Sequence, residues 1–344
     1  MSWLRKTLVH FALSRSDAAL IDASGGEARV VRDMTLDPRM QFLEHQARQR
    51  GVDWDTMSVE RLREQTEAMC ALFGGPKVRG VRTERIYITG RSHSVPGRLY
   101  LPRVRDNSAA MLVYYHFGGG VIGSLECCHR LCALIAKTAG APVLSVEYRL
   151  APEHKFPAGQ DDALTAFQWA LENAARYGAP AGKVAVGGDS QGGNFAAVAA
   201  QKFRGARGPM LQLLIYPALD LVGESASMTD FGDAFPLTRD TVDFFLKHYL
   251  PTGVDHGDPR ISPGRVEDVS GVAPALIYTA GFDMLLDQGE AYADRLMAAG
   301  IAVKRTRFSS LPHGFVAMPS AAPAAEAALR QIARETAEAL KDAV

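Results

Sequence analysis

The chain has 344 residues, of which 38 are Lys or Arg and 38 are Asp or Glu, so its formal net charge at pH 7 is zero. A balanced charge without a long run of one sign argues against a nucleic acid or another polyanion as partner. No apolar run approaches the roughly 18–20 residues of a membrane span, and the first residues lack the pattern of a secretory signal. We therefore expect a cytoplasmic protein without stable membrane insertion.

The first 75 residues are predicted to form helices with polar interruptions. Apolar residues recur at helical spacing over 3–13 and over 59–73, and Ser58 stands where the second of these helices needs an N-cap. The helix over 3–13 could lie on a membrane surface, but docking onto the rest of its own chain is the commoner arrangement.

From residue 83 onward the pattern changes to strands that alternate with helices. An antiparallel pair over 83–88 and 95–101 opens the sheet. Continuous apolar runs follow at 111–115, 142–146, 183–187, 211–216 and 274–279, and helical patterns lie at 125–139, 161–175, 191–204, 288–299 and 324–342. Such runs are typical of parallel strands buried on both faces. The alternation predicts an α/β fold with a mostly parallel sheet of about eight strands flanked by helices.

One connection is far longer than a usual loop. About 55 residues separate the strand over 211–216 from the next strand, and within them Thr238 is placed to cap an amphipathic helix. We interpret residues 218–270 as an inserted lid that joins residues 1–75 in a helical cap. Residues 76–217 and 271–344 then form the main α/β domain. A surface excursion remote from any site is the alternative.

A serine stands where the strand over 183–187 passes into the next helix. The residues at 188–192 read Gly-Asp-Ser-Gln-Gly, and the two glycines remove Cβ atoms that would collide in so tight a turn. The turn presents Ser190 above the sheet, next to the free N–H groups at the start of the helix. Ser190 is therefore the candidate nucleophile. A Gly-x-Ser-x-Gly sequence in an ordinary flexible turn is the alternative.

Three consecutive glycines follow the strand over 111–115, after His116 and Phe117. Glycines let backbone N–H groups turn toward a ligand, which is what the stabilisation of an oxyanion in acyl transfer requires. Phosphate binding is the alternative, but the chain has neither G-x-x-x-x-G-K-[ST] nor a G-x-G-x-x-G followed by an acidic residue about 20 positions on. The loop at 118–120 is the candidate oxyanion hole.

A base and its orienting acid are expected after the serine, each on a loop that follows a strand. The strand over 274–279 leads to Asp283 and Asp287, and a strand over 303–308 leads to His313, the only histidine after residue 256. Asp283 follows the strand end directly, whereas Asp287 is placed to cap the helix over 288–299. We therefore expect Asp283 to orient His313, and His313 to take the proton of Ser190.

The four cysteines are expected to be free thiols. Cys70 stands alone, and Cys127, Cys128 and Cys132 lie too close together to join distant loops. Cys128, His129 and Cys132 have a helical spacing that zinc could use, but a second pair of ligands at a fitting spacing is missing. We expect no metal and no cofactor.

Five motifs together resemble the hormone-sensitive lipase family of α/β-hydrolases, which includes the bacterial family IV esterases. They are His-Phe-Gly-Gly-Gly at 116–120, Tyr-Arg-Leu-Ala-Pro-Glu at 148–153, Gly-Asp-Ser-Gln-Gly-Gly at 188–193, Asp-Met-Leu-Leu-Asp at 283–287 and His-Gly-Phe at 313–315. The resemblance covers roughly residues 83–320. It implies a carboxylic ester hydrolase with a helical cap, without metal or cofactor, that prefers short to medium acyl chains. Matched by position, it implies Ser190 as nucleophile, His313 as base and Asp283 as orienting acid.

One motif departs from the family pattern. In the family this loop usually has a histidine, three glycines and an aromatic residue in that order. Here Phe117 precedes the glycines, and Gly120 takes the place of the aromatic residue. Aligned without a gap, Gly118 and Gly119 still match the two oxyanion donors of the loop, and the N–H of Gln191 is the third. The exchange is expected to change the wall beside the ester, and with it the substrate preference.

Other uses of the same residues stay open. Amide or lactone hydrolysis, and acyl transfer to an acceptor other than water, begin with the same steps as ester hydrolysis. A non-catalytic member of the fold that binds a small ligand is a further alternative, because a fold does not dictate a function. The strand over 303–308 carries charges that protect a sheet edge, yet such an edge can also pair two subunits in a homodimer.

Overall fold

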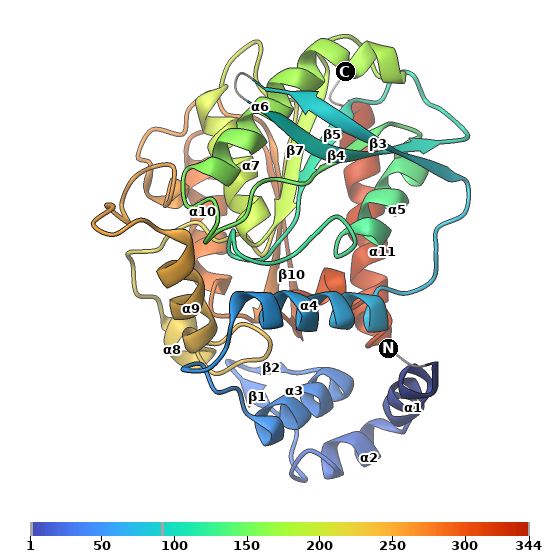
Figure 1. Ribbon diagram of the computed structural model, residues 1–344, viewed down its shortest axis with the longest axis vertical. Coiled ribbons are helices and arrows are strands. Elements are labelled where there is room, and N and C mark those ends of the chain that lie inside the picture. The colour runs from blue at the N-terminus through green and yellow to red at the C-terminus, as the bar shows by residue number, and fades with distance from the viewer. Residues whose placement is uncertain (1–2, 91–92, 343–344) are drawn as a thin grey trace.

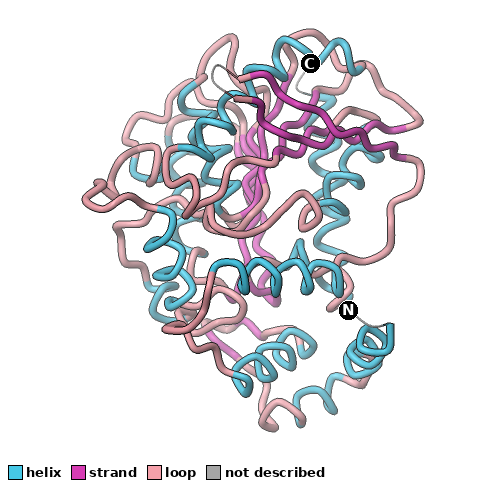
Figure 2. Tube along the Cα trace, viewed as in Figure 1, coloured by secondary structure: helices cyan, strands magenta, loops and turns pink. Residues whose placement is uncertain are grey.

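The predicted sheet forms the centre of the computed structural model, which describes residues 3–90 and 93–342 (Figures 1 and 2). Within these residues its eight strands lie in the order β10-β9-β8-β7-β5-β6-β4-β3. The strands are β3 (Val81–Thr89), β4 (Ser94–Pro102), β5 (Met111–Tyr115), β6 (Val143–Val146), β7 (Val184–Asp189), β8 (Gln212–Ile215), β9 (Ala275–Phe282) and β10 (Val303–Pro312). β4 pairs antiparallel with β3 and with β6, and the other neighbours in this order pair in parallel. The mostly parallel sheet and its opening antiparallel pair are confirmed.

Alternate residues of the central strands face two different cores. Leu112 and Tyr114 of β5 belong to the core with α5 (His129–Ala139) and α11 (Pro323–Asp342). Val113 and Tyr115 belong to the core with α6 (Ala158–Asn173), α7 (Gln191–Lys202) and α10 (Leu286–Ala298). Because helices cover both faces, the strands read as continuous apolar runs rather than as alternating ones.

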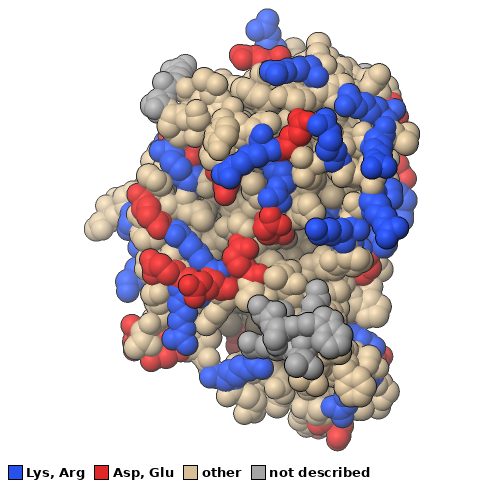
Figure 3. Space-filling model, turned by 45° about the vertical axis from the view of Figure 1, so that its right-hand side comes forward, with Lys and Arg blue, Asp and Glu red and all other residues tan. Residues whose placement is uncertain are grey.

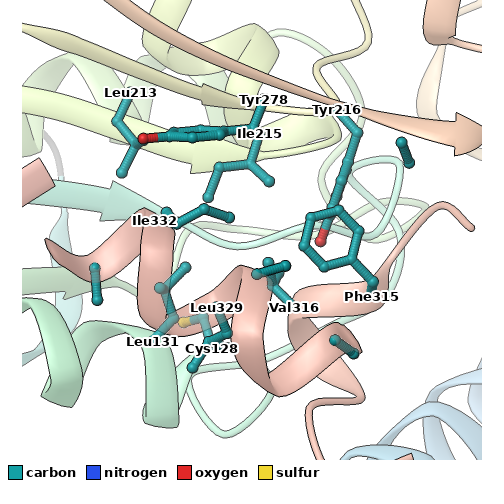
Figure 4. Packing of buried hydrophobic residues seen from close by; sticks show 14 of the residues in the cluster. Cys128, Leu131, Leu213, Ile215, Tyr216, Tyr278, Phe315, Val316, Leu329 and Ile332 are labelled. Atoms are coloured by element: carbon teal, nitrogen blue, oxygen red, sulfur yellow. The ribbon is translucent and has the colours of Figure 1, made fainter. Parts of the chain in front are cut away.

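The core on the α5 and α11 side is closely packed. Figure 4 shows Leu131 of α5 and Ile332 of α11 gathered beneath Ile215 of β8. All three side chains are fully buried. The apolar side of the last helix, which the sequence predicts over 324–342, therefore faces the sheet.

The described residues of the N-terminal segment, 3–75, form four helices and one hairpin. Its elements are α1 (Trp3–Leu13), α2 (Asp17–Asp22), β1 (Val30–Val31), β2 (Met34–Thr35), α3 (Pro38–Arg50) and α4 (Val59–Phe73). Ser58 caps α4 as predicted, because its hydroxyl accepts the N–H of Arg61 at 3.2 Å. The hairpin was not expected: its turn places Arg32 and Asp33 at φ 49° and 60°, and arginine is not a residue that signals such a turn.

The long connection after β8 contains α8 (Ala226–Asp230), α9 (Arg239–Tyr249) and a short 3₁₀ helix, η2 (Pro263–Arg265). Thr238 caps α9 as predicted, since its hydroxyl accepts the N–H of Thr241 at 3.2 Å. α8 and α9 lie at the same end of the sheet as the N-terminal helices (Figure 1).

Ion pairs and a ring contact join this connection to the N-terminal segment. Asp233 pairs with both Arg29 and Arg48 at 2.7 Å, and Asp230 pairs with Arg32 at 2.5 Å. Further along, the Trp54 and Phe244 rings lie 5.3 Å apart. Two segments that are about 200 residues apart in sequence are thus joined at one end of the sheet.

The surface and the sheet edge agree with the charge pattern. Figure 3 shows acidic and basic side chains side by side over much of one face. β10 ends the sheet, and the charges it carries are paired, with Arg305 on Asp294 and Arg307 on Glu290. In the described part of the chain, no helix has both the length and the apolar character needed to cross a bilayer. A homodimer through β10 stays a prediction.

Ile332→Ala should lower the free energy of unfolding by about 2–5 kcal/mol, because the side chain is fully buried between α11 and the sheet. Arg334→Ala, on the exposed side of the same helix, should change it by about 0.5 kcal/mol or less. Urea denaturation of both variants measures the difference. Similar losses in the two would contradict the packing face assigned to α11.

Candidate active site

The turn between β7 and α7 holds Ser190 in a conformation that few non-glycine residues adopt. Its φ and ψ are 55° and −117°, and its N–H donates to the carbonyl of Ile215 at 2.9 Å. A Cβ added at Gly192 would lie 2.0 Å from the carbonyl oxygen of Tyr115, and one at Gly188 would lie 2.3 Å from the Gly192 carbonyl carbon. Only glycine at both positions allows β5, β7 and α7 to approach so closely, which is the reason predicted for this motif.

Ser190, His313 and Asp283 form one hydrogen-bonded chain. His313 Nε2 lies 3.0 Å from Ser190 Oγ, and His313 Nδ1 lies 2.7 Å from Asp283 Oδ2. The three residues are 8%, 6% and 1% exposed, so little water reaches these contacts. Because a carboxylate only accepts hydrogen bonds, Nδ1–H donates to Asp283 and Nε2 is left to accept the serine proton. The structure thus brings together the three residues that the sequence singled out.

Asp283 stands at the junction of β9 and α10. Its Oδ1 accepts the N–H of Leu285 at 2.8 Å, while Oδ2 faces His313. The N–H of Leu285, the residue just before α10, therefore helps to fix the carboxylate that orients the imidazole.

Asp287 lies elsewhere, and the cap predicted for it is wrong. It belongs to the first turn of α10, where its carboxylate pairs with Arg32 at 2.7 Å and accepts the N–H of Ser227 at 2.7 Å. The prediction rested on the position of Asp287 near the start of one helix and took no account of segments distant in sequence. The folded chain brings α8 and the β1–β2 turn next to that helix, and Asp287 binds both.

The loop after β5 contains backbone N–H groups without protein partners in the part of the chain that the structure describes. Gly118, Gly119 and Gly120 have φ values of 122°, 60° and 72°, all in the region that favours glycine. Among the described residues, no protein acceptor pairs with the N–H groups of Gly118, Gly119 and Gln191. Unpaired N–H groups in a loop and at a helix N-terminus are the kind of donors that an oxyanion requires.

His116 braces this loop. Its ring stacks on Tyr148 with 4.3 Å between the centroids, and its Nδ1 donates to the carbonyl of Phe117 at 2.7 Å. Tyr148 in turn donates its hydroxyl to the His116 carbonyl at 2.8 Å. Burial lowers the pKa of His116 to about 4, so the ring is neutral at pH 7. His116 therefore shapes the loop rather than exchanging protons.

A second buried carboxylate lies next to the serine, and the sequence analysis missed it. Asp189 accepts the hydroxyl of Tyr114 at 2.9 Å and that of Tyr216 at 3.0 Å, and it is fully buried. Burial raises its pKa to about 6, although the two phenols partly oppose the rise. The signal was present in the sequence, because Tyr114 and Tyr216 lie at the ends of strands that flank β7.

Tyr216 also contacts the imidazole. Its ring centroid lies 4.6 Å from that of His313. The Phe315 ring packs against Tyr216 in a T-shaped arrangement with 5.2 Å between the centroids (Figure 4). Tyr216 is the residue directly after β8, and its φ of 34° is unusual for a tyrosine. The packed ring and the hydroxyl bond to Asp189 together restrict how far the His313 ring can turn.

The hypothetical zinc ligands point to other partners. Cys128 Sγ lies 3.2 Å from the Ser145 hydroxyl, and His129 Nδ1 lies 3.2 Å from the Tyr100 hydroxyl. Within residues 3–90 and 93–342, no group of three or more His, Cys, Asp or Glu side chains could hold a metal ion. All four cysteines are buried and free.

Comparison with known proteins gives one consistent result. The α/β hydrolase fold family matches residues 112–317. The chain is 42% identical to the carboxylic ester hydrolase LipN of Mycobacterium tuberculosis over 85% of this chain and 80% of that protein. It is 38% identical to the ethyl acetate hydrolase of Pseudomonas putida over 77% of this chain and 85% of that one.

A solved structure agrees with these relatives over nearly the whole chain. The ester hydrolase EH1AB1 from the metagenome of Lake Arreo, determined with a bipyridine phosphonate derivative, is 35% identical. The alignment covers 88% of this chain and 98% of that one, with a TM-score of 0.82.

Asp189→Asn should become more stable relative to the unsubstituted protein as the pH rises from 4.5 to 8. Ionising Asp189 costs more in the fold, where its pKa is about 6, than in the unfolded chain, where it is near 3.9. The unsubstituted protein therefore loses the stability that its protonated Asp189 contributes as the pH rises through about 6. Its free energy of unfolding should fall by about 2 kcal/mol relative to that of Asp189→Asn over this range.

Urea denaturation of both proteins at the two pH values measures this change. Asp55→Asn, at an exposed position, is the control and should show no such pH-dependent difference. A constant gap between Asp189→Asn and the unsubstituted protein would show that Asp189 does not titrate in this range.

Proposed function

The chain is a carboxylesterase that belongs to the hormone-sensitive lipase family of α/β-hydrolases, and we propose that it works through a triad of Ser190, His313 and Asp283. The hydrogen-bonded chain of 3.0 Å and 2.7 Å that joins these three side chains carries the proposal. It is the geometry that a hydroxyl nucleophile, a base and an orienting acid need.

Attack on the ester begins at Ser190. His313 accepts the hydroxyl proton at Nε2 while Oγ bonds to the carbonyl carbon, and Asp283 stabilises the imidazolium that forms. The burial of these groups supports this step, because charge interactions are stronger where water is excluded. Asp189 adds a second negative group near the imidazolium when it is ionised.

The negative charge that develops on the carbonyl oxygen needs donors that already face it. We assign this role to the N–H groups of Gly118, Gly119 and Gln191. Their lack of protein acceptors in the described chain supports the assignment, and the positive end of α7 adds to the favourable field.

Two half-reactions complete the cycle. The tetrahedral intermediate collapses when His313 gives its proton to the leaving alcohol oxygen, which leaves an ester between the acyl group and Ser190 Oγ. A water molecule then loses a proton to His313, attacks the same carbonyl carbon, and releases the carboxylic acid while Ser190 regains its proton.

We assign residues 1–75 and 218–270 to a cap over this site, and residues 76–217 and 271–344 to the catalytic domain. The ion pairs of Asp233 and Asp230 with arginines of the N-terminal segment support a cap that moves as one unit. We propose short to medium acyl esters as substrates, a class that includes the ethyl acetate hydrolysed by the Pseudomonas putida relative.

Ser190→Ala should reduce kcat/KM for p-nitrophenyl acetate and butyrate by about 10⁴-fold or more, because the attacking oxygen is lost. Ser270→Ala, on an exposed loop, is the matched control and should retain full activity. Initial rates of p-nitrophenolate release measure both. Turnover by Ser190→Ala at the unsubstituted rate would refute the nucleophile.

Asp283→Asn and Asp287→Asn separate the two candidate acids. The first should lower kcat/KM for p-nitrophenyl butyrate by about 10³–10⁴-fold, since an amide no longer selects the tautomer in which Nε2 accepts the serine proton. The second removes a partly exposed ion pair with Arg32 and should cost about tenfold or less. The reverse ranking would exchange their roles.

A further inference from the structure

We propose that an open cavity between α1, α3 and α11 is a second ligand-binding site, separate from the triad, and that it takes an organic monocarboxylate with an apolar chain. The cavity has a volume of about 480 Å³, within the range of about 300–1,000 Å³ that ligand sites usually have. Among the described residues, its lining includes neither the triad nor the glycine loop. Binding there would therefore be independent of ester hydrolysis.

The walls of this cavity come from segments far apart in sequence. α1 contributes His10 and Leu13, and α3 contributes Arg39. Arg130 comes from α5 and Glu326 from α11. α1 lies beside the N-terminal end of α11 (Figure 1). A ligand in the cavity would thus contact both the N-terminal segment and the main α/β domain.

Apolar side chains form much of the lining. They are Leu13, Pro76, Pro319, Ala321, Ala322 and Pro323. Prolines and alanines have no flexible side chain that could turn into the cavity and fill it. An alkyl chain placed against them leaves water and covers apolar surface of the protein at the same time, which is favourable.

Two arginines of the lining share one carboxylate. Arg130 donates Nε–H to Glu326 at 3.2 Å, and Arg330 Nη2 pairs with the same side chain at 2.7 Å. Arg130 also donates from Nη1 to the Pro76 carbonyl, and it is only 7% exposed, so its position is fixed. One carboxylate neutralises only one of two guanidinium charges. The two arginines and Glu326 therefore leave one positive charge that a ligand can neutralise.

Arg39 is the third arginine of the lining. Its Nη1 pairs with Asp17 at 2.8 Å, but the Asp17 side chain is 64% exposed, and such a surface pair contributes little. Asp17 and Asp37 both approach Arg39, yet neither lines the cavity. Arg39 and Arg330 are thus two cations at the wall, and a planar guanidinium can donate two parallel hydrogen bonds to a carboxylate.

Charge and lining together define the class of ligand. A single negative charge neutralises the excess, and a carboxylate matches the fork of a guanidinium. An apolar chain on the same molecule covers the proline and alanine surface. Inorganic phosphate would meet the arginines but leave that surface in water, so it should bind less tightly than a carboxylate with a chain of several carbons.

Isothermal titration of the full chain with sodium octanoate tests the site, with acetate, octanamide and inorganic phosphate as comparison probes at one ionic strength. Octanoate should bind about tenfold or more tightly than acetate or phosphate, because its chain buries apolar area. Octanamide has the chain without the charge, and it should bind about tenfold or more weakly than octanoate.

Variants of the cavity wall locate the binding. Arg39→Gln and Arg330→Gln should each raise the dissociation constant for octanoate by about tenfold, since each removes a charged hydrogen-bond donor. Arg39→Lys keeps the charge but loses the planar fork, so it should raise the constant less. Arg334→Gln, at an exposed position of α11 outside the lining, is the matched control and should leave the constant within about twofold.

The thermal unfolding midpoint of each variant shows whether it is folded. Unchanged octanoate binding in both folded glutamine variants would overturn the inference, because octanoate would then bind elsewhere. So would octanoate affinity that phosphate or octanamide equals, or absence of octanoate binding by the unsubstituted chain. The titration measures no turnover, so failure of this site and failure of the proposed triad are distinguishable.

Discussion

The turn between β7 and α7 has no space for side chains, and the geometry around the serine depends on that constraint. The carbonyl of Tyr115 lies where a Cβ at Gly192 would be, so the end of β5 reaches the backbone of the turn itself. This close approach brings the glycine loop after β5, the first N–H of α7 and the Ser190 hydroxyl to one place. A serine on an ordinary loop would have one of these neighbours, not all of them.

The buried carboxylates near the serine need hydrogen-bond donors of their own. An unpaired carboxylate in the interior is costly, and each of the two carboxylates here accepts two hydrogen bonds. Asp283 accepts from His313 and from the backbone at the start of α10. Asp189 accepts from two tyrosines that come from the strands on either side of β7. The site is therefore organised before any substrate binds, which is what lowers the cost of forming charge during catalysis.

α9 packs against a glycine loop whose sequence departs from the family pattern. Moving the aromatic residue from the end of the glycine loop to Phe117 leaves the backbone of Gly119 and Gly120 uncovered from within the loop. Phe245 and Tyr249 cover it instead, from a helix more than a hundred residues away in sequence. Any side chain at Gly120 would collide with the Tyr249 ring, so the glycine and the ring depend on each other.

The sequence alone determined the parts that depend on neighbours in the chain. Buried parallel strands read as apolar runs, Ser58 and Thr238 cap the helices that they precede, and the order of serine, acid and histidine after successive strands singled out the three residues that meet. Only the tertiary structure decided what depends on contacts between distant segments. The position of Asp283 directly after a strand favoured it over Asp287, but the partners of Asp287 came only from the fold, where Arg32 and Ser227 reach it. Packing likewise decided which rings cover the glycine loop. The periodicity of a helix shows which of its sides is apolar, but not which distant segment that side contacts.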